Sequence, residues 1–467
     1  MLDPKLVREN PEVVKEAARV KRVGTPELVD QWVAADERRR KSQAAADTLR
    51  AQQSGLGKYV GKLKNPKQAE AAVAELKGAV KEAGDAIVQR ATGGVSEVQA
   101  ATDFVLGESA RLKGEYEKEL ATQAAAEAEA AEIMLQLPAI PDPAWPIGRD
   151  AEENVVVREW ADSSRPPAKL SGGMKDHVTL GKDLGILDFE RGVKLAGSRS
   201  YVVRGAGALL YNAVLRFAQD VLVKRGYEMF VVPVLVTEQC MIGTGYFPAG
   251  KEQAYVTQDN GVLVGTSEVP LASFHGGEIL DESEMPKKYA ALSTCFRREA
   301  GAAGKDTAGL YRVHQFDKVE QVIVHKADEA EHIALHEEII KNAEDILQAL
   351  KLPYRVVQNC TGDMGQGKWR MYDIETWMPS RGAYGETHSG SALKDFQARR
   401  LNLRYKAKVE GGKSETRFCY TLNNTAIACP RVLIAILEGY QNEDGSVTVP
   451  EVLRGYMGEV ERIAAKG

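Results

Sequence analysis

The chain has 467 residues, 44% of them hydrophobic, which is long enough for at least two domains with a sizeable core. Its formal net charge is only -5, so it is not a globally basic nucleic-acid binder, and any contact with a phosphate backbone must come from a local patch. The scattered cysteines form no CxxC pair, which predicts reduced thiols without structural zinc: Cys240, Cys295, Cys360, Cys419 and Cys429. Neither a signal peptide nor an apolar run of about 18 residues is apparent, so we expect a cytoplasmic protein without a membrane span.

A change of composition divides the chain. Residues 1–138 are rich in Ala, Lys, Glu, Gln and Arg and show almost no strand pattern. From Ala139 the sequence turns to proline and glycine in IPDPAWPIG, and then to mixed strand and helix patterns. This shift predicts an N-terminal helical domain over 1–138 and a second domain over 150–467.

The N-terminal part has the pattern of an antiparallel helical hairpin. From Leu28 to Leu63, apolar residues recur at alternating spacings of three and four, which is typical of a coiled coil. About 35 helical residues would make a rod of about 50 Å. The segment LKNPKQ ends this helix near Pro66, and Ala- and Glu-rich segments bring the chain back. Gly84, Gly93 and Gly94 interrupt the return limb, so we expect an extra helical element at the tip.

The first limb of this hairpin is locally basic. Between Asp30 and Lys67, nine Lys or Arg stand against four acids. Such a stretch on an acidic protein predicts contact with a phosphate backbone, although a solvated coiled coil used only for dimerisation explains the pattern equally well. The candidate nucleic-acid-binding residues are Arg38, Arg39, Arg40, Lys41, Arg50, Lys58 and Lys62.

The second part begins with an amphipathic helix and a strand that ends at Pro233. The helix is predicted by apolar residues at 209, 210, 213, 214, 217 and 221. Further on, Thr266, Ser267 and Glu268 close an apolar run before a proline. Taken alone, Glu268 is best explained as an acid in the first turn of a helix. His332 and His336 lie four apart, and a surface helix explains them better than a metal site that lacks a third ligand.

The segment CFRREAGAAGKDTAGLYRVHQFDKVE, residues 295–320, predicts two antiparallel strands joined by a long loop that contains glycine. A surface hairpin with many ion pairs is the alternative. The sequence then predicts a helix through about Leu350 and strands in YRVVQ and MYDIETWM. It ends with a strand that leads into a helix at Arg431. An arginine at a helix N-terminus opposes the helix dipole, which is unfavourable unless an anion lies there.

The chemistry-bearing residues of this second part suggest one type of site. Fixed arginines suit a polyphosphate, and a carboxylate suits a magnesium ion that bridges phosphates. An aromatic ring and a flat guanidinium can sandwich a base, and further acids suit an ammonium group. Together these features predict amino-acid activation by ATP. The residues concerned are Glu268, Glu320, Glu386, Arg297, Arg431 and Phe316.

The motifs TSEVP, FRREAG with RVHQFDKVE, DFQARR and TLNNTAIACPR resemble those of the bacterial type of seryl-tRNA synthetase, and the resemblance runs from residue 1 to about 458. It implies an α+β class II synthetase: an antiparallel-sheet catalytic domain with an N-terminal antiparallel coiled-coil arm. It also implies a homodimer through the helix and strand that end at Pro233, and an arm that grips the long variable arm of tRNA(Ser). The loop between the two strands would face the tRNA acceptor end.

The resemblance implies ATP-dependent formation of seryl-adenylate from L-serine and transfer to the 3′ end of tRNA(Ser), with tRNA(Sec) as a further candidate acceptor. Arg297 and Arg431 would be catalytic. The ATP-binding residues would be Arg297, Arg298, Glu299, Val313, Phe316, Glu386, Thr387, His388, Ser389 and Arg431. Glu386 and Ser389 would hold Mg²⁺ with the ATP. The serine-binding residues would be Thr266, Ser267, Glu268, Arg297, Glu320 and Thr425.

Four departures from the family pattern stand out, one of which is that residues about 81 to 115 are longer than the typical arm. The other three lie in the second part of the chain. Thr387-His388-Ser389-Gly390-Ser391 occupies the place of a usual Ser-Ser-Cys-Ser run, Asn424-Thr425 replaces a usual Gly-Ser, and Pro430 replaces a usual glycine. Two alternatives therefore stay open. One is a paralogue that activates a small amino acid for a carrier protein or serves as a resistance duplicate. The other, of a different class, is an inactive RNA-binding module.

Overall fold

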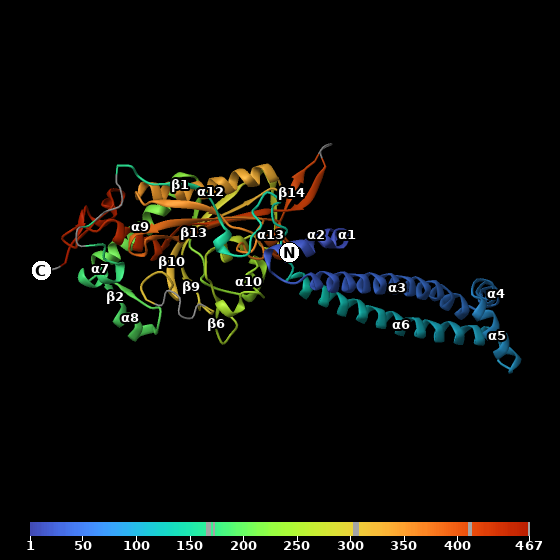
Figure 1. Cartoon of the computed structure of the whole chain (residues 1–467). Helices are drawn as coiled ribbons and strands as arrows, with labels where there is room; N and C mark the ends of the chain where they lie inside the picture. The colour runs from blue at the N-terminus through green and yellow to red at the C-terminus, as the bar shows by residue number, and fades with distance from the viewer. Residues whose placement is uncertain (165–169, 171–172, 302–307, 410–412, 466–467) are drawn as a thin grey trace. The chain divides into compact units, whose positions relative to one another are not determined.

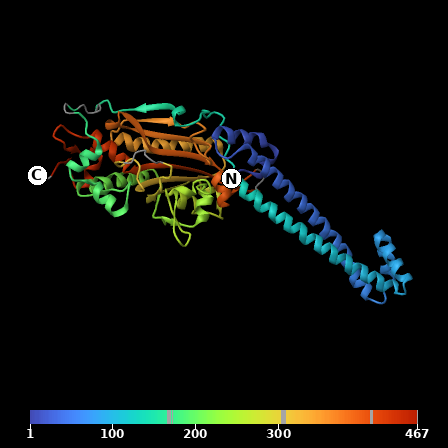
Figure 2. The ribbon, with the colours of Figure 1, turned by 60° about the horizontal axis from the view of Figure 1, so that its bottom comes forward.

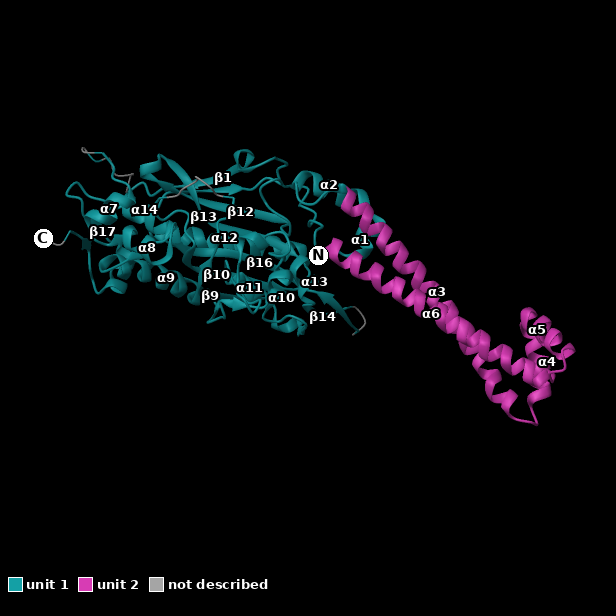
Figure 3. Cartoon of the chain, turned by 90° about the horizontal axis from the view of Figure 1, so that it is seen from below, with its two compact units in different colours: residues 1–26, 135–467 teal, residues 27–134 magenta. Residues whose placement is uncertain are grey.

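The computed structural model describes residues 1–164, 170, 173–301, 308–409 and 413–465. It divides into two compact units, one formed by residues 1–26 with 135–467 and the other by residues 27–134 (Figure 3). The first 26 residues therefore cluster with the second part of the chain. They form the helices α1 (Pro4–Glu9) and α2 (Pro11–Lys21).

The larger unit is built on an eight-stranded sheet (Figure 1). Its pairs are antiparallel except at one edge, where β4 runs parallel to β9. The prediction of an α+β fold on an antiparallel sheet is therefore confirmed. In spatial order the strands are β1 (Val155–Trp160), β11 (Tyr354–Gln358), β12 (Arg370–Met378), β13 (Ala383–Lys394), β16 (Tyr420–Cys429), β10 (Gln315–His325), β9 (Lys287–Phe296) and β4 (Glu228–Phe230).

Three helices pack on this sheet and form the main core with it: α9 (Ala206–Lys224), α12 (Glu329–Ala349) and α14 (Arg431–Gly439). Leu210, Ile340 and Ile427 lie in that core and are completely buried. Shorter helices complete the unit: α7 (His177–Asp183), α8 (Phe189–Ala196), α10 (Glu238–Thr244), α11 (Glu268–Ser273) and α13 (Phe396–Leu401). The remaining strands are β2 (Leu187–Asp188), β3 (Val202–Val203), β5 (Leu235–Val236), β6 (Tyr255–Val256), β7 (Val262–Leu263), β8 (Ile279–Asp281), β14 (Arg404–Lys408), β15 (Ser414–Phe418), β17 (Val447–Thr448) and β18 (Arg462–Ile463).

The two strands predicted from residues 295–320 are confirmed as β9 and β10, with Phe296 opposite Gln315. They are not a surface hairpin, because β10 also pairs with β16 and most of its residues are buried. The middle of the loop between them, residues 302–307, lies outside the described residues. The expectation that this loop faces the tRNA acceptor end stays a prediction.

The expected surface position of His332 and His336 is wrong, because both side chains are buried in α12. Their spacing of four places them on the same helix face as Leu335 and Ile339, which packs against the sheet. His332 Nδ1 lies 2.7 Å from Nε2 of His325. Within the described residues no group of three or more His, Cys, Asp or Glu is arranged to hold a metal ion.

The smaller unit is the predicted helical hairpin, made of α3 (Pro26–Lys64) and α6 (Glu97–Met134), which run side by side in Figure 2. Five of the predicted coiled-coil positions are buried, namely Trp32, Ala35, Ala46, Leu56 and Leu63, and the other three are half-buried. Val29 and Tyr59, which the predicted spacing leaves out, are buried as well. Among the described residues no helix, however long, is apolar enough to cross a membrane.

The tip carries two extra helices, α4 (Ala69–Ala79) and α5 (Lys81–Thr92), so the expectation of an added helical element is confirmed. The interruption lies at Val80, which is extended, and not at Gly84, which is inside α5. Gly93 and Gly94 end α5 as expected. Leu76, Ile87 and Val105 bury their side chains together, so the tip has its own small core.

Candidate active site

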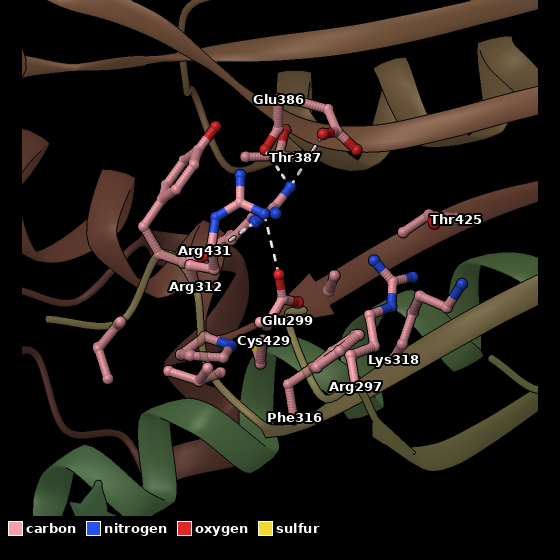
Figure 4. Close-up of a pocket in the computed structure, with 15 residues that line it drawn as sticks. Arg297, Glu299, Arg312, Phe316, Lys318, Glu386, Thr387, Thr425, Cys429 and Arg431 are labelled. Atoms are coloured by element: carbon pink, nitrogen blue, oxygen red, sulfur yellow. Dashed lines mark hydrogen bonds and ion pairs between the residues drawn. The ribbon is translucent and has the colours of Figure 1, made fainter. Parts of the chain in front are cut away.

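A cleft opens on the sheet where the ends of β9, β10, β13 and β16 meet the N-terminus of α14. It consists of two adjoining hollows, the larger with a volume of about 470 Å³. Both are lined by Arg297, Glu299, Arg312, Lys318, Glu386, Thr425 and Arg431. A concave site with a few convergent charged groups is the usual form of a small-molecule site. Figure 4 shows these side chains converging on the smaller hollow.

Two guanidinium groups lie over aromatic rings in this cleft. The guanidinium carbon of Arg297 lies 5.1 Å from the ring centre of Phe316, and that of Arg431 lies 4.6 Å from the ring centre of Tyr311. Backbone carbonyls fix Arg431, because its Nε donates to the oxygen of Tyr311 and its Nη1 to that of Glu386, both at 2.9 Å. The two charges are thus held before any ligand arrives, which suits a polyphosphate.

Arg431 is the first residue of α14, as predicted, and its side chain reaches the Glu386 carboxylate at 3.2 Å. This anion offsets the unfavourable position of the arginine at a helix N-terminus. Desolvation opposes the charged form of Glu386, but Arg431 and Arg297 outweigh it and hold the pKa of this carboxyl below its ordinary value. Glu386 is therefore an anion at neutral pH.

A β-bulge decides which residues of β13 enter the cleft. Opposite β12 the register shifts, so that Ile374 pairs with His388 but the next residue, Glu375, pairs with Glu386. The extra residue, Thr387, breaks the alternation of the strand. As a result Glu386 and Ser389, three residues apart, both line the larger hollow, which a regular strand would not allow.

A buried acid lies beside Glu386, which is itself partly exposed. Asp373 of β12 is directly opposite Ser389, and its Oδ2 accepts a hydrogen bond of 2.8 Å from the Asn359 side chain. Burial, together with repulsion from Glu386, raises the pKa of Asp373 to about 8. Glu386 and Asp373 are therefore not both ionised at neutral pH in the free protein, and Glu386, beside the arginines, carries the charge.

The other end of the cleft holds a buried carboxylate in a closed hydrogen-bond network. Glu268 begins α11 but is 7% exposed, so it is more than an acid in a first helical turn. It accepts hydrogen bonds from the Tyr246 hydroxyl at 2.7 Å and from the amides of Gln397 and Asn423 at 2.8 Å each. Three neutral donors fix the carboxylate and leave its charge uncompensated by a neighbouring cation within that network.

Next to it lies a buried ion pair between Lys318 and Glu320, both on β10. Lys318 Nζ also donates to Thr266 Oγ1 at 2.8 Å. Glu320 lies opposite Thr425 of β16, whose hydroxyl is 3.4 Å from its carboxylate. Burial raises the pKa of Glu320 above its ordinary value, and Lys318 opposes that shift. The pair of acids, Glu268 and Glu320, suits a small ligand that carries an ammonium group.

Most of the site residues predicted from sequence come together in this cleft. The residues that line it are Arg297, Glu299, Val313, Phe316, Glu386, Thr387, Ser389, Arg431, Glu268, Glu320 and Thr425. Thr266 lies just behind Lys318.

Three predicted residues lie elsewhere. Ser267 is completely buried and donates to the Ala291 carbonyl at 3.3 Å, and Arg298 is exposed, with its backbone amide bonded to Gln253. His388 points away because of the bulge, and burial lowers its pKa to about 3.

Sequence reasoning missed several residues that shape the site. Tyr246 and Asn423 hold Glu268, Tyr311 supports Arg431, and Lys318 neutralises Glu320. Lys318 and Asn423 stand two residues from Glu320 and Thr425 on the same strands. Because side chains of a strand alternate, that spacing is the signal that would have found both.

Asn424, one of the departures from the family pattern, packs against a glycine of the neighbouring strand. Asn424 lies directly opposite Gly390 in the pairing of β13 with β16. A Cβ atom at position 390 would come within 3.0 Å of the Asn424 side chain and 2.3 Å of Ile340. The glycine therefore makes room for Asn424, and the Asn424 side chain, which donates to the Ile339 carbonyl, points away from the ligand side where Thr425 lies.

In the smaller unit, five of the seven candidate nucleic-acid-binding residues already pair with acids. Arg39 and Arg40 share Asp36; Arg38 pairs with Glu129, Lys41 with Glu37 and Lys62 with Glu75. Arg50 and Lys58 are exposed. The pairs of Arg38, Lys41 and Lys62 are exposed and worth at most about 1 kcal/mol each, so they do not prevent these residues from engaging phosphates. Arg39 and Arg40 instead share the buried carboxylate of Asp36.

Comparison with known proteins identifies two matching family models. Residues 1–93 match the seryl-tRNA synthetase N-terminal domain, and residues 255–440 match the tRNA synthetase class II core domain (G, H, P, S and T). The chain is similar to serine--tRNA ligases of Deinococcus radiodurans, at 39% identity, and of Rubrobacter xylanophilus, at 40%, each over 98% of both chains.

Solved structures give the same result. The seryl-tRNA synthetase from Pyrococcus horikoshii, complexed with ATP, superposes with a TM-score of 0.84 at 34% identity and covers 100% of both chains. The cytoplasmic serine-tRNA ligase from Naegleria fowleri, in complex with AMP, has a TM-score of 0.81 at 30% identity and covers 100% of this chain and 99% of its own.

Proposed function

This chain belongs to the seryl-tRNA synthetase family, and we propose that it activates L-serine with ATP and transfers the seryl group to the 3′ end of tRNA(Ser). The observation that carries the proposal is the composition of the cleft. Arg297, Arg431 and Phe316 lie at one end, and Glu268 and Glu320 lie buried at the other. An amino-acid adenylate carries its negative phosphate beside the arginines and its positive ammonium group beside the acids in this arrangement.

In the first step an oxygen of the serine carboxylate attacks the α-phosphorus of ATP in line, the bond to the bridging oxygen breaks, and pyrophosphate leaves. In the second step a hydroxyl of the terminal adenosine of tRNA attacks the seryl carbonyl, and AMP leaves. No side chain need act as a nucleophile, because positioning and charge stabilisation by Arg297 and Arg431 supply the catalysis. Val313 and Phe316 form the platform for adenine, with Glu299 at its edge.

Glu386 and Ser389 are the residues that would hold Mg²⁺. One carboxylate and one hydroxyl, placed on the same side by the bulge, fit an ion that is bound mainly by water and substrate phosphates. When bound, the ion neutralises phosphate charge. Arg431, which donates to the Glu386 carbonyl, and Arg297, which lies over the Phe316 ring, position the phosphates of ATP.

Serine recognition follows from the buried groups. Glu320 and Glu268 receive the ammonium group, Thr266 borders them, and Thr425 places a hydroxyl within reach of the serine side chain. A site that hydrogen-bonds the serine hydroxyl rejects alanine by about 10⁴ or more, because its own polar groups would be left unpaired. Threonine must be excluded by the size of the pocket.

Residues 1–138 serve as the tRNA-binding part and residues 150–467 as the catalytic part. Arg50 and Lys58 contact the tRNA backbone, together with basic residues of α3 that can exchange an exposed acid for a phosphate.

Exposed apolar residues support a homodimer: Val231 is fully exposed, and Leu209 and Val223 of α9 are each about half exposed. The cytoplasm is the compartment in which we place the enzyme.

Serine-dependent exchange of labelled pyrophosphate into ATP tests the activation step directly. We expect exchange with serine, a rate lower by about 10² with threonine because of its extra methyl group, and a rate lower by about 10⁴ or more with alanine. Equal exchange with threonine would overturn the assignment of the pocket. Activation of serine without transfer to tRNA would instead favour a paralogue that charges a carrier protein, and no exchange at all would favour an RNA-binding module.

A further inference from the structure

The tip of the arm contains a groove of about 650 Å³ that the proposed chemistry does not use. It lies between α3, the junction of α4 with α5, and α6. Leu56, Leu112 and Tyr59 form a buried floor, and the half-buried Phe104 ring lines one wall. An apolar floor with an aromatic wall would accept a flat ring.

The rim of this groove offers both hydrogen-bond donors and acceptors. Lys58 and Arg111 provide donors, and Glu82 provides an acceptor. Arg111 forms ion pairs with Glu108 and Glu115, so the acids and bases around it are balanced and the groove itself is not an anion site. Mixed donors and acceptors suit the edge of a nucleobase better than a phosphate.

The last part of α3, beside the groove, has the opposite character, because its charged residues are all basic. Residues 48–69 contain five Lys or Arg and no Asp or Glu. They are Arg50, Lys58, Lys62, Lys64 and Lys67. A basic stretch that tracks a phosphate backbone next to an aromatic-lined hollow is the usual arrangement for an unpaired nucleotide.

Gly55 lines the groove in the middle of α3, and a Cβ there would meet nothing within 4 Å. Packing does not require glycine at this position, and in a helix interior it costs about 1 kcal/mol relative to alanine. Because Gly55 has no side chain, the groove stays open next to the backbone of α3.

We propose that this groove binds one unpaired base of the tRNA, while the basic face of α3 holds the adjoining phosphates. The inference rests on the proposed function, since it takes tRNA as the substrate. It gives the α4–α5 tip a specific role, because Ala79, Val80 and Glu82 form one side of a pocket that the hairpin alone lacks.

The experiment fills the groove without removing a charge. Gly55→Gln places a side chain in it, and Gly57→Gln is the matched control, because Gly57 lies on the same helix, also in open space, but does not line the groove. Phe104→Ala removes the stacking wall. Each variant and the wild-type protein are assayed for aminoacylation at varied tRNA concentration, for pyrophosphate exchange without tRNA, and for protection of unpaired tRNA bases from chemical modification.

We expect Gly55→Gln and Phe104→Ala to raise the KM for tRNA between about five- and 150-fold, the range of one stacked base. Gly57→Gln should stay within about twofold of wild type, and pyrophosphate exchange should not change in any variant. One unpaired base should be protected by the wild type and by Gly57→Gln but not by Gly55→Gln.

Equal KM values for Gly55→Gln and Gly57→Gln, in a protein that charges tRNA, would overturn this inference and leave the proposed function intact. A higher KM without any change in base protection would also overturn it, because the groove would then hold something other than a base, such as a protein partner. If the wild-type protein charges no tRNA, the proposed function fails and this inference fails with it.

Discussion

Replacement of Glu320 by glutamine separates the role of this residue in the reaction from its role in stability. Glu320 is 1% exposed and paired with Lys318, which is also buried. Loss of one member of a buried ion pair typically costs 3–5 kcal/mol, roughly, because the other charge stays buried without its partner. Lys318 keeps Thr266 Oγ1 as an acceptor, so we expect a cost near the lower end, about 3 kcal/mol, for Glu320→Gln.

The same substitution removes a charged partner of the serine ammonium group. A hydrogen bond to a charged group is worth about 1.5–3 kcal/mol, which corresponds to a decrease in kcat/KM for serine of about ten- to 150-fold. Glu320 lines the larger hollow but not the smaller one, where Phe316 and Val313 lie, so the KM for ATP should change by less than about threefold.

Urea unfolding and pyrophosphate exchange at varied serine and ATP concentrations measure the two effects. The double variant Glu320→Gln with Lys318→Met should regain most of the stability, because no buried charge is left without a partner, but not the activity. Glu338→Gln, which breaks the partly exposed pair with Lys288, is the control and should cost less than about 1 kcal/mol with normal kinetics. Serine kcat/KM within twofold of wild type for Glu320→Gln, or activity that returns together with stability in the double variant, would refute the role in serine binding.

Three further predictions concern charge. Arg297→Ala should lower kcat by about 10²–10³, measured by pyrophosphate exchange, and a kcat within twofold of wild type would contradict its role at the α-phosphate. Glu386→Gln should raise the Mg²⁺ concentration needed for half-maximal ATP binding by at least about tenfold in calorimetric titrations, whereas an unchanged Mg²⁺ dependence would remove Glu386 from the metal site. Burial lowers the pKa of His336 to about 4, so its neutral form contributes stability that is fully present above the unfolded pKa of about 6.5 and is lost as the pH falls toward 4. At pH 5 the loss of unfolding free energy is about 2 kcal/mol. In urea unfolding, the free energy of His336→Gln should therefore decrease less between pH 7.5 and 5 than that of the wild type. An equal decrease would show that His336 does not titrate in this way.

The sequence predicts most of the elements because their periodicity is strong. The heptad spacing from Leu28 to Leu63 indicated the long helix α3, and the alternation around Phe316 and Glu320 indicated β10. The position of Arg431 at a helix start was also predictable, since a strand pattern changes there to a helical one. Local patterns determine these features without help from distant parts of the chain.

Features that depend on partners far away in the sequence were not predictable. The bulge at Thr387 arises from pairing with β12 and decides that Ser389, and not His388, faces the cleft. The burial of His332 in α12 depends on how that helix packs on the sheet, which composition alone does not reveal. In the same way, Glu268 looks like an ordinary helix acid until Tyr246, Gln397 and Asn423 are brought to it by the fold.

Aminoacylation of total tRNA with labelled serine, threonine, alanine and cysteine, in the presence of ATP and Mg²⁺, tests the central claim most directly. We expect charging with serine alone, which would show that the replacement of the usual Gly-Ser by Asn424-Thr425 keeps the selectivity of the family. Charging with threonine at a comparable rate, or no charging with serine, would contradict it.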